Sequence, residues 1–233
     1  MDEKIKLTDQ DNNSGTVASY VPFYTDDNIT LFNDDYRNII DSFPPFNFII
    51  TDPPYGVNKA KWDLKNDWEI LLAGFGAGVS KMLAEDGVLI IFTSTRYLAK
   101  TIDWIKLPYR WQFIWYCSNN MIPGDIGFAK YTSALIFSNK KSVHVNAQDL
   151  REYPAGTTEL KSSFHPTPKP IDIIGYLIER FTKEGDRILD PFCGSGTALL
   201  ASKKLGREAV GIEISQEYCE GIIKRLSQTE MFV

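Results

Sequence analysis

The chain has 233 residues, of which 43% are hydrophobic and 13% aromatic, and its net charge at pH 7 is −5. These values exclude a disordered or fibrous chain and predict one large soluble globular domain. The longest apolar run, Val88 to Phe92, is too short to cross a bilayer and no signal peptide opens the sequence, so no membrane segment is expected. The three cysteines show neither zinc-ligand spacing nor an even disulfide set, which predicts a cytoplasmic protein without a metal site.

Acidic charge is concentrated at the amino end of the chain. Residues 1–41 hold nine acidic and three basic residues, whereas the stretch from Arg96 to Lys169 holds ten basic and five acidic residues. A polyanionic partner is therefore allowed if it meets the middle of the chain. On charge alone, an ordinary solvated surface explains this distribution equally well.

An irregular, acidic sequence covers residues 1–28, which we interpret as an N-terminal arm, and residues 29–233 are predicted to form one domain. The domain opens with a short predicted strand from Ile29 to Phe32 and a helix through Ile39 and Ile40. A proline-rich turn at residues 43–46 then leads to the next strand.

The stretch from Phe48 to Tyr55 joins a buried strand to a stiff turn. Its apolar start is typical of a parallel sheet, and Pro53 and Pro54 must end the strand because they lack backbone N–H groups. Asp52 therefore stands at the carboxyl end of a buried strand, where open α/β sheets bind their ligands.

These groups suit the alkylation of an exocyclic amine on a nucleobase. Such an amine shares its lone pair with the ring, and acceptors for its two N–H bonds would favour a pyramidal, nucleophilic nitrogen. Asp52 and the Pro53 carbonyl supply the acceptors, and the Tyr55 ring supplies a face on which the base can stack. Taken alone, a strand end with a proline turn and a core tyrosine explains these residues equally well.

Helices and strands alternate after this motif. A helix from about Trp68 to Ala84 and a buried strand from Val88 to Phe92 complete the strand–helix–strand pattern of a parallel sheet. A second helix is expected from Thr95 to Lys106. The segments from Arg110 to Cys117 and from Ser133 to Phe137 predict two β segments, antiparallel at an edge of the sheet.

A second constellation lies near the end of the chain. A strand from Arg187 to Asp190 is followed by a glycine loop and by a helix that begins near Thr197, and a further strand ends at Glu213. This is the pattern of the first strand–helix–strand unit of a Rossmann-like sheet. The glycines would let the backbone approach an adenosine moiety, and Glu213 could accept hydrogen bonds from both ribose hydroxyls.

Three motifs in this order resemble the beta class of prokaryotic and phage DNA amino-methyltransferases: Asp52-Pro53-Pro54-Tyr55, His165-Pro166-Thr167-Pro168-Lys169-Pro170 and Asp190-Pro191-Phe192-Cys193-Gly194-Ser195-Gly196-Thr197. The resemblance covers about residues 29–226, with the circularly permuted order in which the catalytic motif precedes the cofactor motif. It implies a Rossmann-like α/β fold of the S-adenosylmethionine-dependent methyltransferases, with a seven-stranded, mostly parallel sheet, one antiparallel strand and helices on both faces. It also implies methyl transfer to N6 of adenine or N4 of cytosine in DNA.

The resemblance gives the matching residues expected roles. Asp52, Pro53, Pro54 and Tyr55 would be catalytic and would receive a flipped base. For S-adenosylmethionine, Asp35 would lie near the adenine and Glu213 at the ribose, and the methionine part would contact His165, Thr167 and Lys169. The remaining residues expected along the cofactor are Asp190, Pro191, Phe192, Gly194, Gly196 and Thr197. Residues 118–165 would form target-recognition loops. The class also allows a homodimer and a place in restriction-modification.

Two positions depart from the family pattern, which often has a lysine near the place of Cys117 or Ser118 and an acid in place of Ser133. Both lie toward the expected DNA-facing edge, so they bear on target recognition. The acid at position 52 favours adenine, because cytosine-N4 enzymes of the family more often carry serine there, and cytosine-N4 methylation stays the alternative.

Two other classes of protein share part of this pattern. Protein-glutamine methyltransferases use a related Asn-Pro-Pro-Tyr motif, but their cofactor motif comes first in the chain. A non-catalytic subunit that only binds nucleic acid would be expected to have lost Asp52, Tyr55 or the glycine loop, and all three are present.

Overall fold

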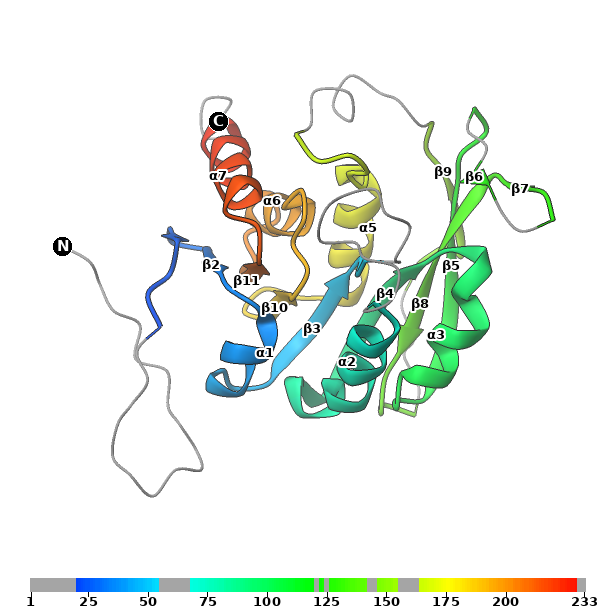
Figure 1. Ribbon diagram of the computed structural model, residues 1–233, viewed down its shortest axis with the longest axis horizontal. Helices are drawn as coiled ribbons and strands as arrows, with labels where there is room; N and C mark the ends of the chain where they lie inside the picture. The colour runs from blue at the N-terminus through cyan, green and yellow to red at the C-terminus, as the bar shows by residue number, and fades with distance from the viewer. Residues whose placement is uncertain are drawn as a thin grey trace.

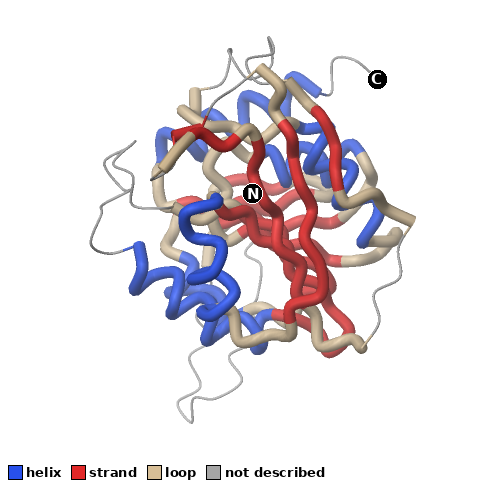
Figure 2. Tube along the Cα trace, turned by 90° about the vertical axis from the view of Figure 1, so that its right-hand side faces the viewer, coloured by secondary structure: helices blue, strands red, loops and turns tan. Residues whose placement is uncertain are grey.

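The computed structural model describes residues 20–54, 68–119, 122–123, 126–141, 146–154 and 164–229. Within these ranges a central sheet is covered by helices on both faces (Figure 1, Figure 2). Its strands are β1 Tyr24–Thr25, β2 Ile29–Asn33, β3 Phe46–Thr51, β4 Leu83–Thr93, β5 Tyr109–Tyr116, β8 Tyr131–Phe137, β9 Leu150–Glu152, β10 Arg187–Asp190 and β11 Glu208–Glu213. They lie in the order β1-β2-β11-β10-β3-β4-β8-β5-β9. A separate two-stranded sheet pairs β6 (Ile122–Pro123) with β7 (Phe128–Ala129).

The strands β2, β11, β10, β3 and β4 run parallel, and β8 runs antiparallel between β4 and β5. This arrangement confirms the expected mostly parallel sheet with a reversed strand, and it confirms the antiparallel pairing of the two segments that became β5 and β8. Two short strands extend the sheet at its margins, β1 antiparallel to β2 and β9 parallel to β5. The sequence did not predict them, because two or three residues are too few to show the alternation of a strand.

Helices cover both faces of the sheet because successive strand residues point to opposite sides. On β3, Phe48 and Ile50 belong to one buried cluster and Ile49 to the other. The first cluster packs under α5 (Ile171–Phe181), α6 (Thr197–Lys204) and α7 (Gln216–Thr229), and the second under α1 (Tyr36–Ile39), α2 (Trp68–Met82) and α3 (Leu98–Trp104). Short 3-10 helices, η1 (Ile40–Ser42) and η2 (Thr95–Tyr97), complete the connections. None of the helices in the described ranges is long and apolar enough to cross a membrane.

The carboxyl ends of the parallel strands meet at one edge of the sheet, which we call the carboxyl edge. Asp52 follows β3, Asp190 ends β10 and Glu213 ends β11. Because β10 lies between β3 and β11, Asp190 stands between the other two acids. The fold therefore brings both predicted motifs to the edge at which open α/β sheets bind their ligands.

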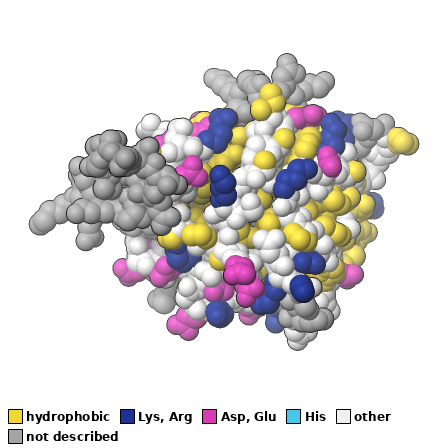
Figure 3. Space-filling view, turned by 90° about the horizontal axis from the view of Figure 1, so that it is seen from below, with side chains coloured by type: hydrophobic (Ala, Val, Ile, Leu, Met, Phe, Trp, Pro, Cys, Tyr) yellow, Lys and Arg dark blue, Asp and Glu magenta, His cyan; other side chains and the backbone are white. Residues whose placement is uncertain are grey.

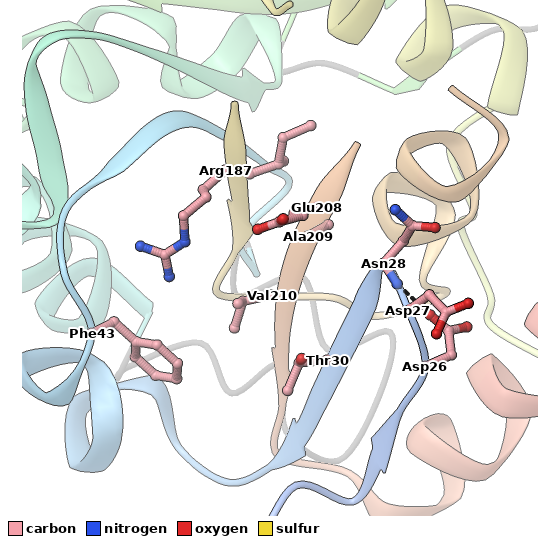
Figure 4. Close-up of a pocket in the computed structure, with 10 residues that line it drawn as sticks. Asp26, Asp27, Asn28, Thr30, Phe43, Arg187, Glu208, Ala209 and Val210 are labelled. Atoms are coloured by element: carbon pink, nitrogen blue, oxygen red, sulfur yellow. Dashed lines mark hydrogen bonds between the residues drawn. The ribbon is translucent and has the colours of Figure 1, made fainter. Parts of the chain in front are cut away.

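A shallow pocket lies at the opposite edge of the sheet (Figure 4). Its lining includes Arg187 and Glu208, the first residues of β10 and β11, and Asn28, which precedes β2. The Arg187 guanidinium lies 4.7 Å from the centroid of the Phe46 ring. Since these residues mark the amino ends of the strands, this pocket is separate from the predicted site.

Two glycines of α2 lead to opposite predictions of stability. A Cβ at Gly76 would lie 2.4 Å from the Trp104 carbonyl oxygen, because α2 and α3 touch there. Gly76→Ala should therefore lower the free energy of unfolding by about 1–3 kcal/mol. A Cβ at Gly74 would meet nothing within 4 Å, so Gly74→Ala should raise it by about 0.5–1 kcal/mol. Urea denaturation of both variants measures the difference, and similar effects would contradict the close approach of α2 and α3.

Candidate active site

A buried hydrogen bond joins the carboxyl ends of β3 and β10. The two strands pair in parallel, with Leu189 opposite Ile49. The Thr51 hydroxyl donates to Asp190 Oδ1 over 2.8 Å, and both side chains are buried. The Phe192 backbone N–H donates to the same oxygen over 3.1 Å. The two motifs, far apart in the sequence, thus lie side by side in one site.

The loop between β10 and α6 turns through two glycines in the left-handed region. Gly194 has a φ of 50° and Gly196, the N-cap of α6, has a φ of 72°. A Cβ at Gly194 would lie 2.9 Å from His165 Nε2, and one at Gly196 would lie 2.7 Å from the Ile222 side chain. Any other residue at these positions would be strained and crowded, so only glycine fits where the loop packs against His165 and Ile222.

Glu213 turns its carboxylate back toward this glycine loop. Its Oε2 accepts the Gly194 N–H over 2.8 Å, and its Oε1 accepts the Ser215 N–H over 2.8 Å. The residue is 8% exposed, and burial raises its pKa although the backbone hydrogen bonds act in the opposite direction. A carboxylate has about four lone-pair sites, so Glu213 can accept a further hydrogen bond from a hydroxyl group.

Asp190 has a strongly perturbed carboxyl group. The pKa of Asp190 is raised to about 7, chiefly by burial; the hydrogen bonds from Thr51 and Phe192 act to lower it, and the charges of Asp52 and Glu213 contribute to the rise. Three acids therefore gather at the carboxyl edge. Such a cluster attracts a positively charged group more strongly than an isolated carboxylate does.

A segment that we call the strap, residues 165–169, links the two motifs. At one end Lys169 Nζ forms an ion pair with Asp52 Oδ2, and this ammonium lies 5.4 Å from the centroid of the Phe92 ring. The Lys169 and Asp52 side chains are 13% and 23% exposed. The Asp52 carboxylate is therefore held at the surface of the site and is partly open to solvent.

The other end of the strap lies against the glycine loop. His165 Nε2 faces Gly194, and its ring meets Tyr218 of α7 edge-on, with centroids 4.9 Å apart. Burial lowers the pKa of His165 to about 4, so its imidazole is neutral at pH 7. The Nδ1 atom accepts the Thr167 backbone N–H over 3.3 Å.

The remaining predicted site residues are less closely gathered. Asp35 lies just after β2, which pairs with β11, so it is near the carboxyl edge. Its side chain, however, caps α1 and forms an ion pair with Arg37 at 2.5 Å, and this interaction lowers the pKa of Asp35. The half-buried Phe192 ring packs edge-on against Tyr36 of α1, with centroids 5.0 Å apart. Pro191 and Thr197 are buried, Pro53 is buried, Pro54 is half-buried and Thr167 is exposed. Tyr55 lies outside the described residues.

The sequence did not predict the residues that support the glycine loop through hydrogen bonds. Arg225 of α7 donates from Nη1 to the Ser195 carbonyl over 2.6 Å and to Thr197 Oγ1 over 3.2 Å. No local pattern distinguishes Arg225 from the other charges of an amphipathic helix. Thr51 did carry a signal, because it is a polar residue in a buried run directly before Asp52.

The two departures from the family pattern are both buried near the carboxyl edge. The Cys117 N–H donates to the Lys130 carbonyl over 2.7 Å, and burial raises the pKa of the Cys117 thiol to about 11. The Ser133 hydroxyl accepts a hydrogen bond from Gln112 Nε2 over 2.9 Å. A thiol and a hydroxyl thus stand where the family often has a lysine and an acid.

Basic residues from the middle of the chain are divided between the two edges of the sheet. Arg96 follows β4 and Lys130 precedes β8, so both are at the carboxyl edge, where they are exposed. Lys140 and Lys141 follow β8 at the opposite edge because β8 runs antiparallel. The face seen from below the view of Figure 1 mixes basic and acidic side chains (Figure 3). Lys59, Lys61 and Lys65 lie outside the described residues.

Comparisons with known proteins agree with this geometry. Residues 146–225 match a family described as DNA methylase (N6_N4_Mtase). The Type II methyltransferase M2.LlaDCHI of Lactococcus lactis subsp. cremoris is 27% identical over 260 residues, covering 92% of this chain and 95% of that protein. The M1.HpyAVI–SAM complex has a TM-score of 0.66 at 28% identity and covers 85% of this chain and 98% of its own. The PvuII DNA methyltransferase (cytosine-N4-specific) has a TM-score of 0.72 at 19% identity over 88% of both chains, which shows a shared fold.

The fold and the site together define a Rossmann-like S-adenosylmethionine-dependent methyltransferase. Within that class the protein is similar to DNA amino-methyltransferases of the N6/N4 type, the family that its three motifs predicted. The site fits the cofactor, because Glu213 offers a buried carboxylate for hydroxyl groups beside the glycine loop at the carboxyl edge. In the described ranges no group of three or more His, Cys, Asp or Glu residues could hold a metal ion.

The raised pKa of Asp190 predicts a pH-dependent stability. The folded protein binds this proton more tightly than the unfolded chain, so ionisation of Asp190 lowers stability as pH rises from about 4 to about 7. Asp190→Asn keeps an acceptor for Thr51 and Phe192 but cannot ionise. Its stability relative to wild type should therefore increase across that range, on the order of 3 kcal/mol.

Urea unfolding of both proteins at several pH values measures this difference. Asp103→Asn, at an exposed position of α3, is the matched control and should give a difference that stays constant with pH. A constant difference for Asp190→Asn as well would show that the Asp190 carboxyl group is not perturbed by burial.

Proposed function

We propose that the protein transfers a methyl group from S-adenosylmethionine to N6 of adenine in DNA, directly and without a covalent enzyme intermediate. The observation that carries the proposal is the position of Asp52. Its partly exposed carboxylate stands at the end of β3, one strand away from the glycine loop and two from Glu213. A carboxylate at this place can accept a hydrogen bond from the adenine amine, and family members that methylate cytosine N4 more often have serine there.

The cofactor, when bound, supplies an activated methyl group on a positively charged sulfonium. We place its adenosine part along the ends of β10 and β11, with the ribose hydroxyls on Glu213 and the adenine toward Asp35. The hydrogen bond from the Gly194 N–H to the Glu213 carboxylate, which sets the glycine loop beside Glu213, and the acidic cluster around Asp190 support this placement.

The strap would hold the methionine part of the cofactor. Lys169 is a cation suited to its carboxylate, and the neutral His165 and the Thr167 hydroxyl offer polar groups beside it. In the structure Lys169 pairs with Asp52 instead. A carboxylate that draws Lys169 away would therefore free Asp52 for the target base.

The target adenine must leave the duplex to reach Asp52, at a cost of a few kcal/mol. Asp52 and the Pro53 carbonyl would accept the two N–H bonds of its amine, so that the nitrogen lone pair points toward the methyl group. Tyr55 would stack on the base. Orientation of the two reactants and exclusion of water are the protein's main contributions to rate. Within residues 118–165 we assign target recognition to the parts at the carboxyl edge, which are the connection between β5 and β8 and the segment after β9.

The product of the reaction tests the target base. Unmethylated DNA incubated with labelled cofactor should yield N6-methyladenine on nucleoside mass spectrometry. Asp52→Ala should lower turnover by about 10²- to 10⁴-fold, because the acceptor for the amine is lost, while calorimetry shows cofactor binding largely unchanged. Asp103→Ala, at an exposed site on α3, is the control. N4-methylcytosine as the only product would exclude adenine as the target, and methylated RNA or protein alone would exclude DNA.

A second test concerns the edge that meets the DNA. If the carboxyl edge binds the backbone, the double variant Arg96→Gln, Lys130→Gln should bind DNA more weakly. Its salt slope should become shallower by up to about 0.9 for each phosphate that the variant no longer neutralises. The matched variant Lys140→Gln, Lys141→Gln removes the same charge at the opposite edge and should change neither value. Cofactor affinity should stay constant in both, and a larger effect of the second variant would place the DNA at the opposite edge.

A further inference from the structure

The β6–β7 hairpin carries exposed apolar side chains. β6 and β7 pair antiparallel, with Pro123 opposite Phe128. Ile126, in the turn between them, is fully exposed (103%), and Phe128 is 67% exposed. A two-stranded hairpin this short has no core of its own to stabilise it, and a large aromatic side chain gains free energy when it leaves water. A binding partner would cover these side chains.

The hairpin leaves the sheet at the carboxyl edge. Tyr116 at the end of β5 pairs with Tyr131 at the start of β8, and the Cys117 N–H donates to the Lys130 carbonyl just beyond that pair. Both ends of the connection that carries the hairpin are thus fixed at this edge. Figure 1 shows β6 and β7 projecting beyond the ends of β5 and β8.

This edge also carries the target site. Phe92 of β4 pairs with Ala134 of β8, and the Phe92 ring lies beneath the ammonium group of Lys169, which pairs with Asp52. The hairpin therefore rises from a strand that neighbours β4, next to the place where the target base would enter. DNA bound there would extend over the hairpin.

The charges near the hairpin favour DNA as the partner. Lys130 follows β7 and is exposed, and Arg96 is exposed at the end of β4. An aromatic and an aliphatic side chain next to basic residues are typical of proteins that insert apolar side chains between base steps while cations hold the backbone.

We propose that Phe128, supported by Ile126, enters the base stack beside the target and fills the space left by the flipped base. The proposal rests on the proposed function, because it requires a base to leave the duplex. An aromatic ring in that space replaces the stacking that the neighbouring bases lose. Phe128 is thus a positioning residue: it stabilises the open duplex and takes no part in methyl transfer.

The test compares a target adenine that is fully paired with one that lies opposite an abasic site. Phe128→Ser should lower turnover on the paired substrate by about tenfold or more, whereas the loss on the unpaired substrate should be small, because unpairing has already occurred. Phe128→Trp should restore activity on the paired substrate. Tyr109→Ser changes an exposed aromatic residue (43%) at the opposite end of β5 and should leave the ratio of the two activities unchanged.

A second measurement separates the flipping of the target base from methyl transfer. With 2-aminopurine in place of the target adenine, wild-type protein should raise the fluorescence as the base unstacks, and Phe128→Ser should raise it much less. Equal loss of turnover on both substrates, or unchanged fluorescence in the variant, would overturn the role of Phe128. So would a fall from dimer to monomer in Phe128→Ser with an unchanged substrate ratio, because the hairpin would then be a contact between copies. Flipping by the wild type without any methylated product would refute the proposed function and leave the role of Phe128 supported.

Discussion

The buried hydrogen bond from Thr51 to Asp190 is the interaction on which the rest of the site depends. A single hydrogen bond adds only about 0.5–1.5 kcal/mol to stability, but loss of one partner would leave a buried polar group unsatisfied. The bond fixes the end of β3 against the end of β10, and so it sets the distance between Asp52 and the glycine loop. The strap then has to span a fixed gap, with Lys169 at one end and His165 at the other.

The electrostatics of the same site favour a cationic ligand. Asp52, Asp190 and Glu213 approach one another at the carboxyl edge, and burial raises the pKa of Asp190 and of Glu213. Such a cluster is unfavourable in the unliganded protein, and a positively charged ligand group relieves it. Lys169 does this in part through its ion pair with Asp52, while the neutral imidazole of His165 adds no charge. A DNA amino-methyltransferase needs both negative and positive groups at its site, because its cofactor is a cation and its DNA substrate is a polyanion.

Much of this architecture could be predicted where a local sequence pattern is compatible with only one kind of structure. The run Phe48 to Ile50 is apolar because β3 is buried on both faces, and two prolines end the strand soon after. The pairing of Thr51 with Asp190 and the contact of Arg225 with the glycine loop could not be predicted, because they join segments far apart in sequence. The distribution of basic residues over the two edges of the sheet could not be predicted by counting charges along the sequence. Lys130 and Lys140 are ten positions apart in one basic region, yet β8 carries them to opposite edges of the sheet.

The order of the strands has a consequence for how the chain is made. β2 and β3 follow each other in sequence, but β11 and β10 lie between them in the sheet, and these strands begin only at Arg187. Until the ribosome has released that part of the chain, β2 and β3 keep unpaired edges that face each other across a gap. Contacts of such long range make folding slow and leave the nascent chain open to association with other chains. The last strands to be synthesised close the sheet and complete the proposed cofactor site together, so a chain interrupted before Arg187 has neither.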